Sequence, residues 1–555
     1  MRPLRDGETA MWLLEISWAG RVWRFASETI RVERDGVEVQ FLGGLRARVR
    51  REIEPFGVAP SPVSAEIEVV WPESIAALVA LGHDLSAATA QLLLHVVGRE
   101  VDPSELVIEG RIVEPSYDEW LAPDGTRHST VTASVEEQPW TDAGAYPPSE
   151  RVVSAETWPL RDPDYDGRVY PLVWGQPGRW RAPDGSSVSA KGSPALVIEK
   201  SGSDNDLLLI CGERVAATQC VVWHEDSTSA TGWTRQTAQP ITYETDGRGT
   251  LCAVVDLVAS GFAVGDPART SGEYWIEWLY DGGLISPNTG EALTGLGDLL
   301  AWFLARVVGR VDHLRMRPVR TWLNRWRTAG YVDEQITPWT WIVDNILPLI
   351  PVSVTSGPSG LILVPWRWSE PRHRAELWLT EGAGAIHVSP VEYVGAPWDR
   401  TNALTLRWAI DPGDNQYKRQ TTITPTKNPD DVDEISALVV RQSHSRLGKL
   451  VGEEITTDIL FDRNSAALTL LWRVHRSAAA PRRVAFDLPP SYAHARPGHR
   501  IDLASEHLLL DCVGDVMAVE IDDHMRVRLE VELGLSQVTT GSVLGLDDDP
   551  KPPEQ

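Results

Sequence analysis

The alternation of apolar and polar residues is most regular from residue 462 onward. Residues 462–477 predict an amphipathic helix, because apolar positions recur at i, i+3, i+4 and i+7 and the opposite face is polar. These positions are Leu468, Leu471, Trp472 and His475. The segment contains no grouping of residues typical of an active site, so we interpret it as part of a scaffold.

Strands are predicted after this helix, as far as about Leu535. Residues 484–488 alternate before a proline pair, and a turn at 497–499 precedes a second alternation. Residues 525–533 separate completely into two sides, which predicts one buried and one solvated face. The apolar side contains Met525, Val527, Leu529, Val531 and Leu533, and the charged side contains Arg526, Arg528, Glu530 and Glu532.

Two hairpins are predicted near the N-terminus. Residues 12–18 alternate up to a glycine-containing turn, and residues 22–25 return. Residues 31–41 form a second hairpin around Asp35-Gly36, a dipeptide suited to the positive φ angles of a type I′ turn. We therefore expect a small β-rich unit at this end of the chain.

The pattern changes twice before it returns to strands. Strands are expected at 65–71 and 106–115, with helical sequence at 73–97 interrupted around Gly82. Later, residues 146–290 are rich in turn-forming residues and contain short strands. Helical spacing then predicts three helices between 294 and 368, near 299–307, near 319–326 and from Thr337-Pro338 to Leu349.

At 555 residues the chain is too long for one hydrophobic core. The fold class expected is mainly β with α insertions (α+β), multidomain. We expect a β domain with a helical insert at 1–145, a loop-rich β domain at 146–290, a Trp-rich helical region at 291–375, a β domain with helix 462–477 at 376–540, and a disordered acidic tail at 541–555.

Composition narrows the classes of function. A net charge of −26 argues against a surface that grips nucleic acid, because phosphates would be repelled. Solubility explains the charge most simply; a surface past which a polyanion slides is the sharper alternative. The sequence shows neither a secretory signal nor an apolar run long enough to cross a membrane, so synthesis in a cytoplasm is expected.

Cysteine and aspartate spacings give weak signals for disulfides and metals. Cys211, Cys220, Cys252 and Cys512 are too dispersed for zinc, and we expect four buried thiols, with a Cys211–Cys220 pair as the lesser alternative. Asp162, Asp164 and Asp166 match the first half of a calcium loop, but Val173 stands where such a loop has its bidentate Glu. An Asp-rich turn competes with a cation site there and is favoured.

Motifs for catalysis are incomplete. Gly357-Pro358-Ser359-Gly360 has the wrong spacing for a nucleophile elbow, and Gly295-x-Gly297 lacks the third glycine of a dinucleotide loop. Glu273 and Glu277 flank Tyr274 and Trp275, and in a strand they would share a face with Trp275, which could form a sugar platform. A charged strand face is the favoured explanation of these two carboxylates.

The chain contains 24 tryptophans. Trp302, Trp322 and Trp326 recur at helical spacing, which favours core or subunit contacts over ligand binding. No catalytic, metal-binding or cofactor-binding residues are therefore assigned, and we expect the protein not to be an enzyme.

Three short stretches carry a family resemblance. They are Trp18 to Phe25 with its continuation Gln40 to Leu45, Gly167-Arg-Val-Tyr-Pro-Leu-Val-Trp-Gly175, and Pro497-Gly498-His499-Arg-Ile501. The chain resembles the central baseplate hub, or tail-tip, proteins of long-tailed bacteriophages and related gene-transfer particles. His499 departs from that pattern, because those chains often have Asp at this position.

The resemblance implies a homotrimer in the virion, at the tail baseplate, assembled in the cytoplasm of a bacterial host. Two tube-like β-barrel domains in each chain, 1–145 and 376–540, would bracket the middle of the chain and imitate tail-tube subunits. Three chains then form a pseudo-sixfold ring around an acidic lumen. The implied partners are a tail-tube or distal tail protein, a tape-measure protein, tail fibre or tip proteins and DNA in transit, bound without specificity.

Two other functions compete with a structural hub. A carbohydrate-active or cell-wall-binding protein would use the Trp-rich middle of the chain with Glu273 or Glu277. A receptor-binding fibre is the weaker alternative, because the sequence shows no repeats. The family transfers no catalytic residues and no cofactor. The charged side of residues 525–533 is expected to face either a channel or a neighbouring subunit.

Overall fold

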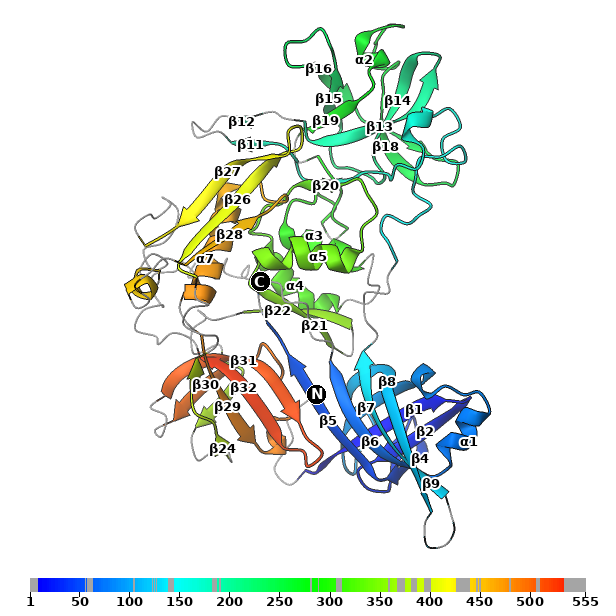
Figure 1. The fold of residues 1–555 in the computed structure, drawn as a ribbon, viewed down its shortest axis with the longest axis vertical. Coiled ribbons are helices and arrows are strands. Elements are labelled where there is room, and N and C mark those ends of the chain that lie inside the picture. The colour runs from blue at the N-terminus through cyan, green and yellow to red at the C-terminus, as the bar shows by residue number, and fades with distance from the viewer. Residues whose placement is uncertain are drawn as a thin grey trace.

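The computed structural model describes most of the chain. The described residues are 8–54, 56, 63–102, 105–121, 123, 125, 127–137, 144–181, 187–188, 191–279, 282–287, 289–305, 312–357, 360–366, 375–380, 387–393, 401–425, 440–445, 448, 451–478, 481–505 and 510–533. Strands dominate and form several sheets, with a few helices between them, which confirms the expected mainly β class with α insertions (Figure 1). The predicted tail 541–555 lies outside the described residues.

The largest sheet has 16 strands and joins the two ends of the chain. Its order is β24-β29-β32-β31-β5-β6-β9-β8-β7-β1-β2-β4-β3, with β23, β25 and β30 beside that path. The N-terminal strands are β1 (Ala10–Trp18), β2 (Arg21–Ala26), β3 (Ile30–Arg34), β4 (Val37–Gly43), β5 (Leu45–Glu52), β6 (Ser64–Trp71), β7 (Thr89–Val96), β8 (Leu106–Leu121) and β9 (Arg127–Glu137). The C-terminal strands are β23 (Leu377–Thr380), β24 (His387–Val388), β25 (Glu392–Tyr393), β29 (Arg482–Leu488), β30 (Arg500–Ser505), β31 (Leu510–Ile521) and β32 (Val527–Leu533).

The two groups of strands meet where β5 pairs with β31. The pairing is antiparallel and aligns Glu52 with Ala518 and Val49 with Ile521. One hydrophobic cluster continues beneath both groups, from Trp12 and Trp71 to Val516 and Leu529. The two ends of the chain therefore share a sheet and a core. Whether each group is tube-like stays a prediction.

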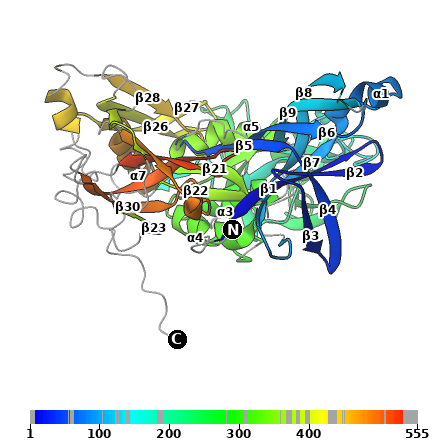
Figure 2. The same ribbon diagram turned by 90° about the horizontal axis from the view of Figure 1, so that it is seen from below.

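The turn chemistry of the N-terminal hairpins is confirmed. Asp35 and Gly36 have φ angles of 51° and 74°, the left-handed values that a type I′ turn requires at both central positions. The turn connects β3 with β4, and in Figure 2 this hairpin extends away from the rest of the N-terminal strands.

The prediction of helix through residues 73–97 is wrong in its second half. Helix α1 covers only Ile75–Ala80, a 3-10 turn (η1) follows at Leu85–Ala87, and Thr89–Val96 is strand β7. β7 lies between β1 and β8, and its residues from Leu92 onward are buried on both faces. An apolar run buried on both faces has no period-2 signature, which is why it resembled a buried helix.

Above this sheet in Figure 1 lies a seven-stranded antiparallel sheet with the order β16-β15-β19-β13-β14-β18-β17. Its strands are β13 (Ser193–Ser201), β14 (Asp204–Cys211), β15 (Gln219–Glu225), β16 (Trp233–Pro240), β17 (Thr242–Thr245), β18 (Leu251–Asp256) and β19 (Tyr274–Trp278). Near it are η4 (Pro163–Tyr165), α2 (Pro267–Thr270) and the pairs β10 (Leu172–Trp174) with β20 (Gly330–Val332) and β11 (Trp180–Arg181) with β12 (Ser187–Val188).

Three helices occupy the centre of the molecule (Figure 1). They are α3 (Leu296–Phe303), α4 (His313–Leu323) and α5 (Pro338–Asn345), the last followed by η6 (Leu347–Leu349) and the hairpin of β21 (Val352–Gly357) and β22 (Gly360–Pro365). All three predicted helices are present. Trp326 lies beyond the end of α4, and position 307 is outside the described residues.

Helix α7 (Arg463–Ala478) confirms the helix predicted at 462–477, but it confirms the predicted buried face only at Trp472 and His475. The deepest positions are Ala466, Leu470 and Val474, while Leu468 and Leu471 are half-buried. The helix joins the central hydrophobic cluster together with the three-stranded sheet of β26 (Ala403–Asp411), β27 (Gln416–Ile423) and β28 (Gly452–Thr456). It is therefore covered on several sides and buries more than one stripe.

Among the described residues, no helix combines the length and the apolar character needed to cross a membrane.

Candidate assembly surfaces

A cluster of ion pairs, with one fully buried carboxylate, lies where the N-terminal strands, the C-terminal strands and α7 meet. Arg483 of β29 approaches Glu54 at 2.9 Å and Glu532 of β32 at 3.5 Å. Arg476, in the last turn of α7, forms ion pairs with the same two carboxylates. Only 2% of the Glu532 side chain is exposed, so its charge depends on these two arginines for stabilisation.

The electrostatics of this cluster favour the charged forms. Burial of Arg476 works against its positive charge, but attraction to Glu532 and Glu54 outweighs burial and raises its pKa. The predicted solvated side of residues 525–533 is therefore wrong at Glu532, which faces the buried cluster. Sequence alternation could not show this, because it does not reveal that α7 covers the end of β32.

Further along the same side of the junction lies a ladder of exposed ion pairs. Arg48 of β5 contacts Glu520 of β31 at 2.7 Å, and Arg50 contacts Glu530 of β32 at 3.5 Å. The arginines are about half exposed, so each pair contributes little by itself to stability. The pairs nevertheless help to fix the register of β5 against β31. A slip by two residues would bring Glu52 opposite Glu520, and like charges repel.

A second buried carboxylate lies beside the junction. Burial raises the pKa of Glu137, at the end of β9, to about 7, although the positive charge of Arg51 acts in the opposite direction. Burial likewise lowers the pKa of Arg51, which donates to the backbone carbonyl of Val107. Both residues belong to strands near β31, so their protonation is coupled to how the sheet is packed.

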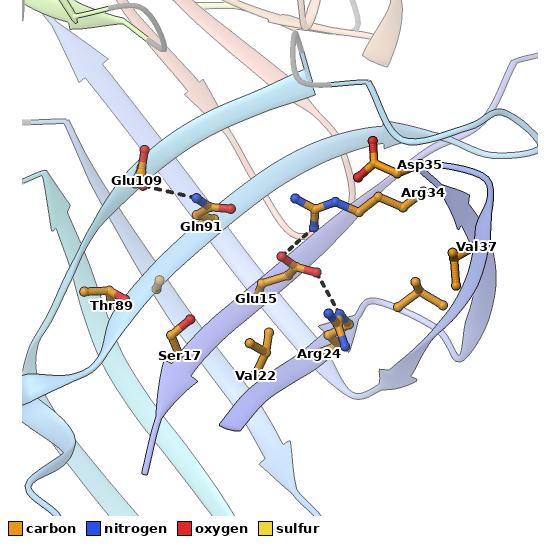
Figure 3. A pocket seen from close by; sticks show the side chains of 12 residues that line it. Glu15, Ser17, Val22, Arg24, Arg34, Asp35, Val37, Thr89, Gln91 and Glu109 are labelled. Carbon is orange, nitrogen blue, oxygen red and sulfur yellow. Dashed lines mark hydrogen bonds and ion pairs between the residues drawn. The ribbon is translucent and has the colours of Figure 1, made fainter. Parts of the chain in front are cut away.

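A groove of about 400 Å³ opens between the β3–β4 hairpin and the outer face of the N-terminal strands (Figure 3). At its centre Glu15 of β1 accepts a hydrogen bond from Nε of Arg24 at 2.8 Å and forms an ion pair with Arg34 at 2.5 Å. Gln91 of β7 donates to Glu109 of β8 at 3.1 Å along one side. The groove adjoins a second hollow of about 650 Å³, and the two share Ser17 and Val22.

Two of the three aspartates of the half calcium loop already have side-chain partners. Asp162 binds Lys200 at 2.7 Å and accepts from the backbone N–H of Asp164, which caps the short helix η4. Asp166 is paired with Arg161. These contacts explain the aspartates as an Asp-rich turn, and no cluster of metal-binding side chains occurs within the described part of the chain.

Glu273 and Glu277 do not form a pair of facing carboxylates. Both oxygens of Glu277 accept from Arg235, at 2.8 and 3.0 Å, and Trp223 donates to one of them at 3.1 Å. Glu273 accepts from the indole of Trp275 at 3.1 Å. Both oxygens of Glu277 are therefore engaged, and the two carboxylates do not face each other, so this geometry does not favour glycoside chemistry.

The tryptophans of the middle region serve in packing. Trp302 and Trp326 are 2% and 1% exposed, and the half-buried Trp322 meets Trp472 of α7 edge to face at 5.7 Å. All four cysteines are buried thiols, as the spacing predicted. The sequence did not reveal the Arg476–Glu54 contact; two arginines at 473 and 476 in a buried helix were its only signal.

No family model matches the sequence, and no curated protein matches it. Among solved structures, the chain is similar to the 43 kDa tail protein of prophage MuSo2 from Shewanella oneidensis, with 9% identity, coverage of 94% of this chain and 98% of that one, and a TM-score of 0.34. A tail protein from Neisseria meningitidis MC58 has 9% identity, with coverage of 95% of this chain and 98% of that one and a TM-score of 0.37. A chain from the virion of a native gene transfer agent particle has 12% identity, with coverage of 67% of this chain and 85% of that one and a TM-score of 0.36. TM-scores of this size establish no shared fold.

Proposed function

We propose that this chain is a structural protein of a phage tail or phage-derived particle, specifically a baseplate hub. In this proposal three copies form a ring that continues the tail tube and closes or conducts the DNA channel. The role is architectural and involves no catalysis. The partners are a tail-tube or distal tail protein, a tape-measure protein and tail fibre or tip proteins.

The observation that carries the proposal is the pairing of β5 with β31. The sequence resemblance implies two β units in each chain that together imitate two neighbouring tube subunits. The pairing of the N-terminal and C-terminal strands in one sheet supports such a double unit, built from both ends of the sequence. A ring of three chains then presents six units to a sixfold tube.

The distribution of apolar surface also supports assembly. Most of the large apolar side chains that are exposed within the described residues belong to the N-terminal β region. A contiguous apolar patch on this unit would be typical of a surface that meets a partner. The exposed side chains are Val22, Val37, Leu42, Val79, Leu81, Val97, Tyr117, Trp120 and Leu121.

The proposal is tested by the symmetry of the purified full-length chain. Mass photometry should give the mass of three chains, and electron microscopy should show threefold particles with a central channel. Incubation with peptidoglycan should release no sugar, and the variants Glu273→Gln and Glu277→Gln should behave as the parent does. A stable monomer at micromolar concentration, or sugar release abolished by either variant, would overturn the proposal.

A further inference from the structure

Helix α4 has an exposed basic face. Residues 314, 317, 318 and 321 recur at i, i+3, i+4 and i+7 and so lie on one side of the helix, with residue 315 at its edge. Arg315 approaches Asp312 at 3.5 Å, a pair open to solvent that contributes little, and Arg317 forms no ion pair within the described part of the chain. Leu314 is 86% exposed, so the face combines unbalanced positive charge with a protruding apolar side chain. Its exposed residues are Leu314, Arg315, Arg317, Pro318 and Thr321.

The charge around α4 is opposite to that of the whole chain. Residues 301–327 contain seven arginines and one aspartate, although the net charge of the chain is −26. Near the start of the helix, burial and the positive charges of Arg315 and Arg51 lower the pKa of Arg496 to about 10. The Nε atom of Arg51 is buried and has no hydrogen-bond partner among the residues that the structure describes. Positive charge is therefore in excess here, and an acidic partner would relieve the repulsion.

The far end of strand β8 has the complementary properties. All six side chains from Ser116 to Leu121 are exposed. The pairing of β7 with β8 ends at Arg111, so within the described residues β9 is the only strand that pairs with this stretch. Between Arg111 and Arg127 the sequence has four carboxylates and no basic residue. Exposed apolar side chains lie among them, and a strand edge of this kind is suited to contact with another chain. They are Tyr117, Trp120 and Leu121.

We propose that the basic face of α4 in one copy docks against the far end of β8 in the next copy of this chain. This inference rests on the proposed ring, in which copies lie side by side. Each surface combines exposed apolar side chains with charge of one sign, and the two signs are opposite, so ion pairs and apolar contacts form together. Because two different surfaces meet, the contact is head-to-tail, and repeated contacts of this type build a ring when the rotation between copies closes.

The two surfaces do not meet within one chain. Figure 1 places α4 at the centre of the molecule and the far ends of β8 and β9 at its lower end, and Figure 2 also separates them. DNA fits the face of α4 less well, because a phosphate backbone offers no apolar contact to the exposed Leu314. A second copy supplies both carboxylates and apolar side chains.

Charge reversal in the full-length chain tests the proposal. Arg315→Glu combined with Arg317→Glu places negative charge on α4 opposite the carboxylates of β8. Mass photometry should show that the concentration at which half of the chains form trimers rises at least tenfold. The control, Arg179→Glu combined with Arg214→Glu, makes the same change in net charge at two exposed arginines between residues 146 and 290 and should leave the trimers intact. Circular dichroism should show the fold of the parent chain in both variants.

The partner surface is tested by a compensating exchange of charge. Glu114→Arg combined with Asp118→Arg should weaken the trimer as the reversal on α4 does. Glu119 is left unchanged, because it accepts a hydrogen bond from the backbone N–H of Ala76 in α1. A chain with all four substitutions restores opposite signs across the contact and should recover most of the parent's trimers. Failure of this combined chain to recover them would overturn β8 as the partner surface.

The same samples separate this inference from the hub proposal. Trimers that persist after the reversal on α4 overturn the docking of α4 and leave the hub intact. A monomeric parent chain overturns the hub and, with it, this contact. Fluorescence anisotropy with a labelled DNA duplex at about 150 mM salt covers the competing ligand, and the parent chain should bind it no more tightly than the α4 variant does. DNA binding that the α4 reversal abolishes, in chains that remain trimers, would assign the face to DNA and overturn the contact between copies.

Discussion

At the residue scale, a cluster of ion pairs around the buried Glu532 joins separate parts of the chain in the described structure. Arg476 comes from α7, Glu54 follows β5, and Arg483 and Glu532 belong to the C-terminal strands. A buried ion pair adds little stability compared with an apolar contact, but removing one partner leaves an uncompensated charge. These residues therefore act by fixing the relative position of the three parts.

Glu532→Gln tests this role. We expect local stability to fall by about 3 kcal/mol, because Arg476 and Arg483 lose one of their two carboxylates in a buried place. Hydrogen exchange followed by mass spectrometry should show faster exchange in β32 and α7. Glu530→Gln, two residues earlier on the same face of β32 but more exposed, is the matched control and should change stability by about 0.5 kcal/mol or less. Equal effects of the two variants would contradict the account.

Glu137 gives the junction a defined pH dependence. Its pKa rises from 4.5 unfolded to about 7 folded, because burial disfavours the charged form. Folding therefore favours the protonated carboxyl, and the stabilisation is complete below pH 4.5 and is lost as the pH rises towards 7. The loss amounts to roughly 3 kcal/mol.

The variant Glu137→Gln should remove this slope. Hydrogen exchange in β9, measured between pH 4.5 and 8, should become less dependent on pH after correction for the intrinsic exchange rate. The neighbouring change Glu136→Gln should leave the slope of the parent chain. A parent chain whose β9 becomes more stable as the pH rises through this range would show that the sign is wrong.

At the element scale, α7 and β7 show what the sequence could and could not predict. In both elements, the apolar residues can be interpreted correctly only when it is known how many faces of the element neighbouring segments bury. The limits of α7 were predictable from periodicity, but its deepest face was not, because β26–β28 cover a side that the sequence treats as peripheral. β7 was mistaken for helix because its two neighbours bury both faces. The turn at Asp35-Gly36 was predictable, because its backbone angles depend on those two residues alone.

Alanine substitutions in α7 measure this difference between its faces. Leu470→Ala should destabilise the central region by about 3 kcal/mol, because the fully buried side chain leaves a cavity. Leu468→Ala should cost roughly half as much, since this side chain is only half-buried. Denaturant midpoints compare the two. A larger effect at Leu468 would mean that the face predicted from the sequence is the correct one.

At the scale of the whole molecule, the union of both chain ends in one sheet is the central feature. The β-rich character of each end was predictable from alternation, but their pairing was not, because no local pattern records a contact between residues 49–52 and 518–521. The groove of Figure 3 escaped prediction for the same reason, since it forms where the β3–β4 hairpin lies over the face of β1, β2 and β7. Candidate ligands such as Asp162 and Glu277 looked similar in sequence to functional carboxylates, and their partners Lys200 and Arg235 became evident only in the fold.

The most direct test of the hub proposal is the symmetry of the full-length chain by electron microscopy. The account predicts a ring of three copies with a central channel, in which the joined sheets of the chains provide six similar β units around the axis. Particles that contain a single copy, or that lack threefold symmetry and a channel, would contradict it.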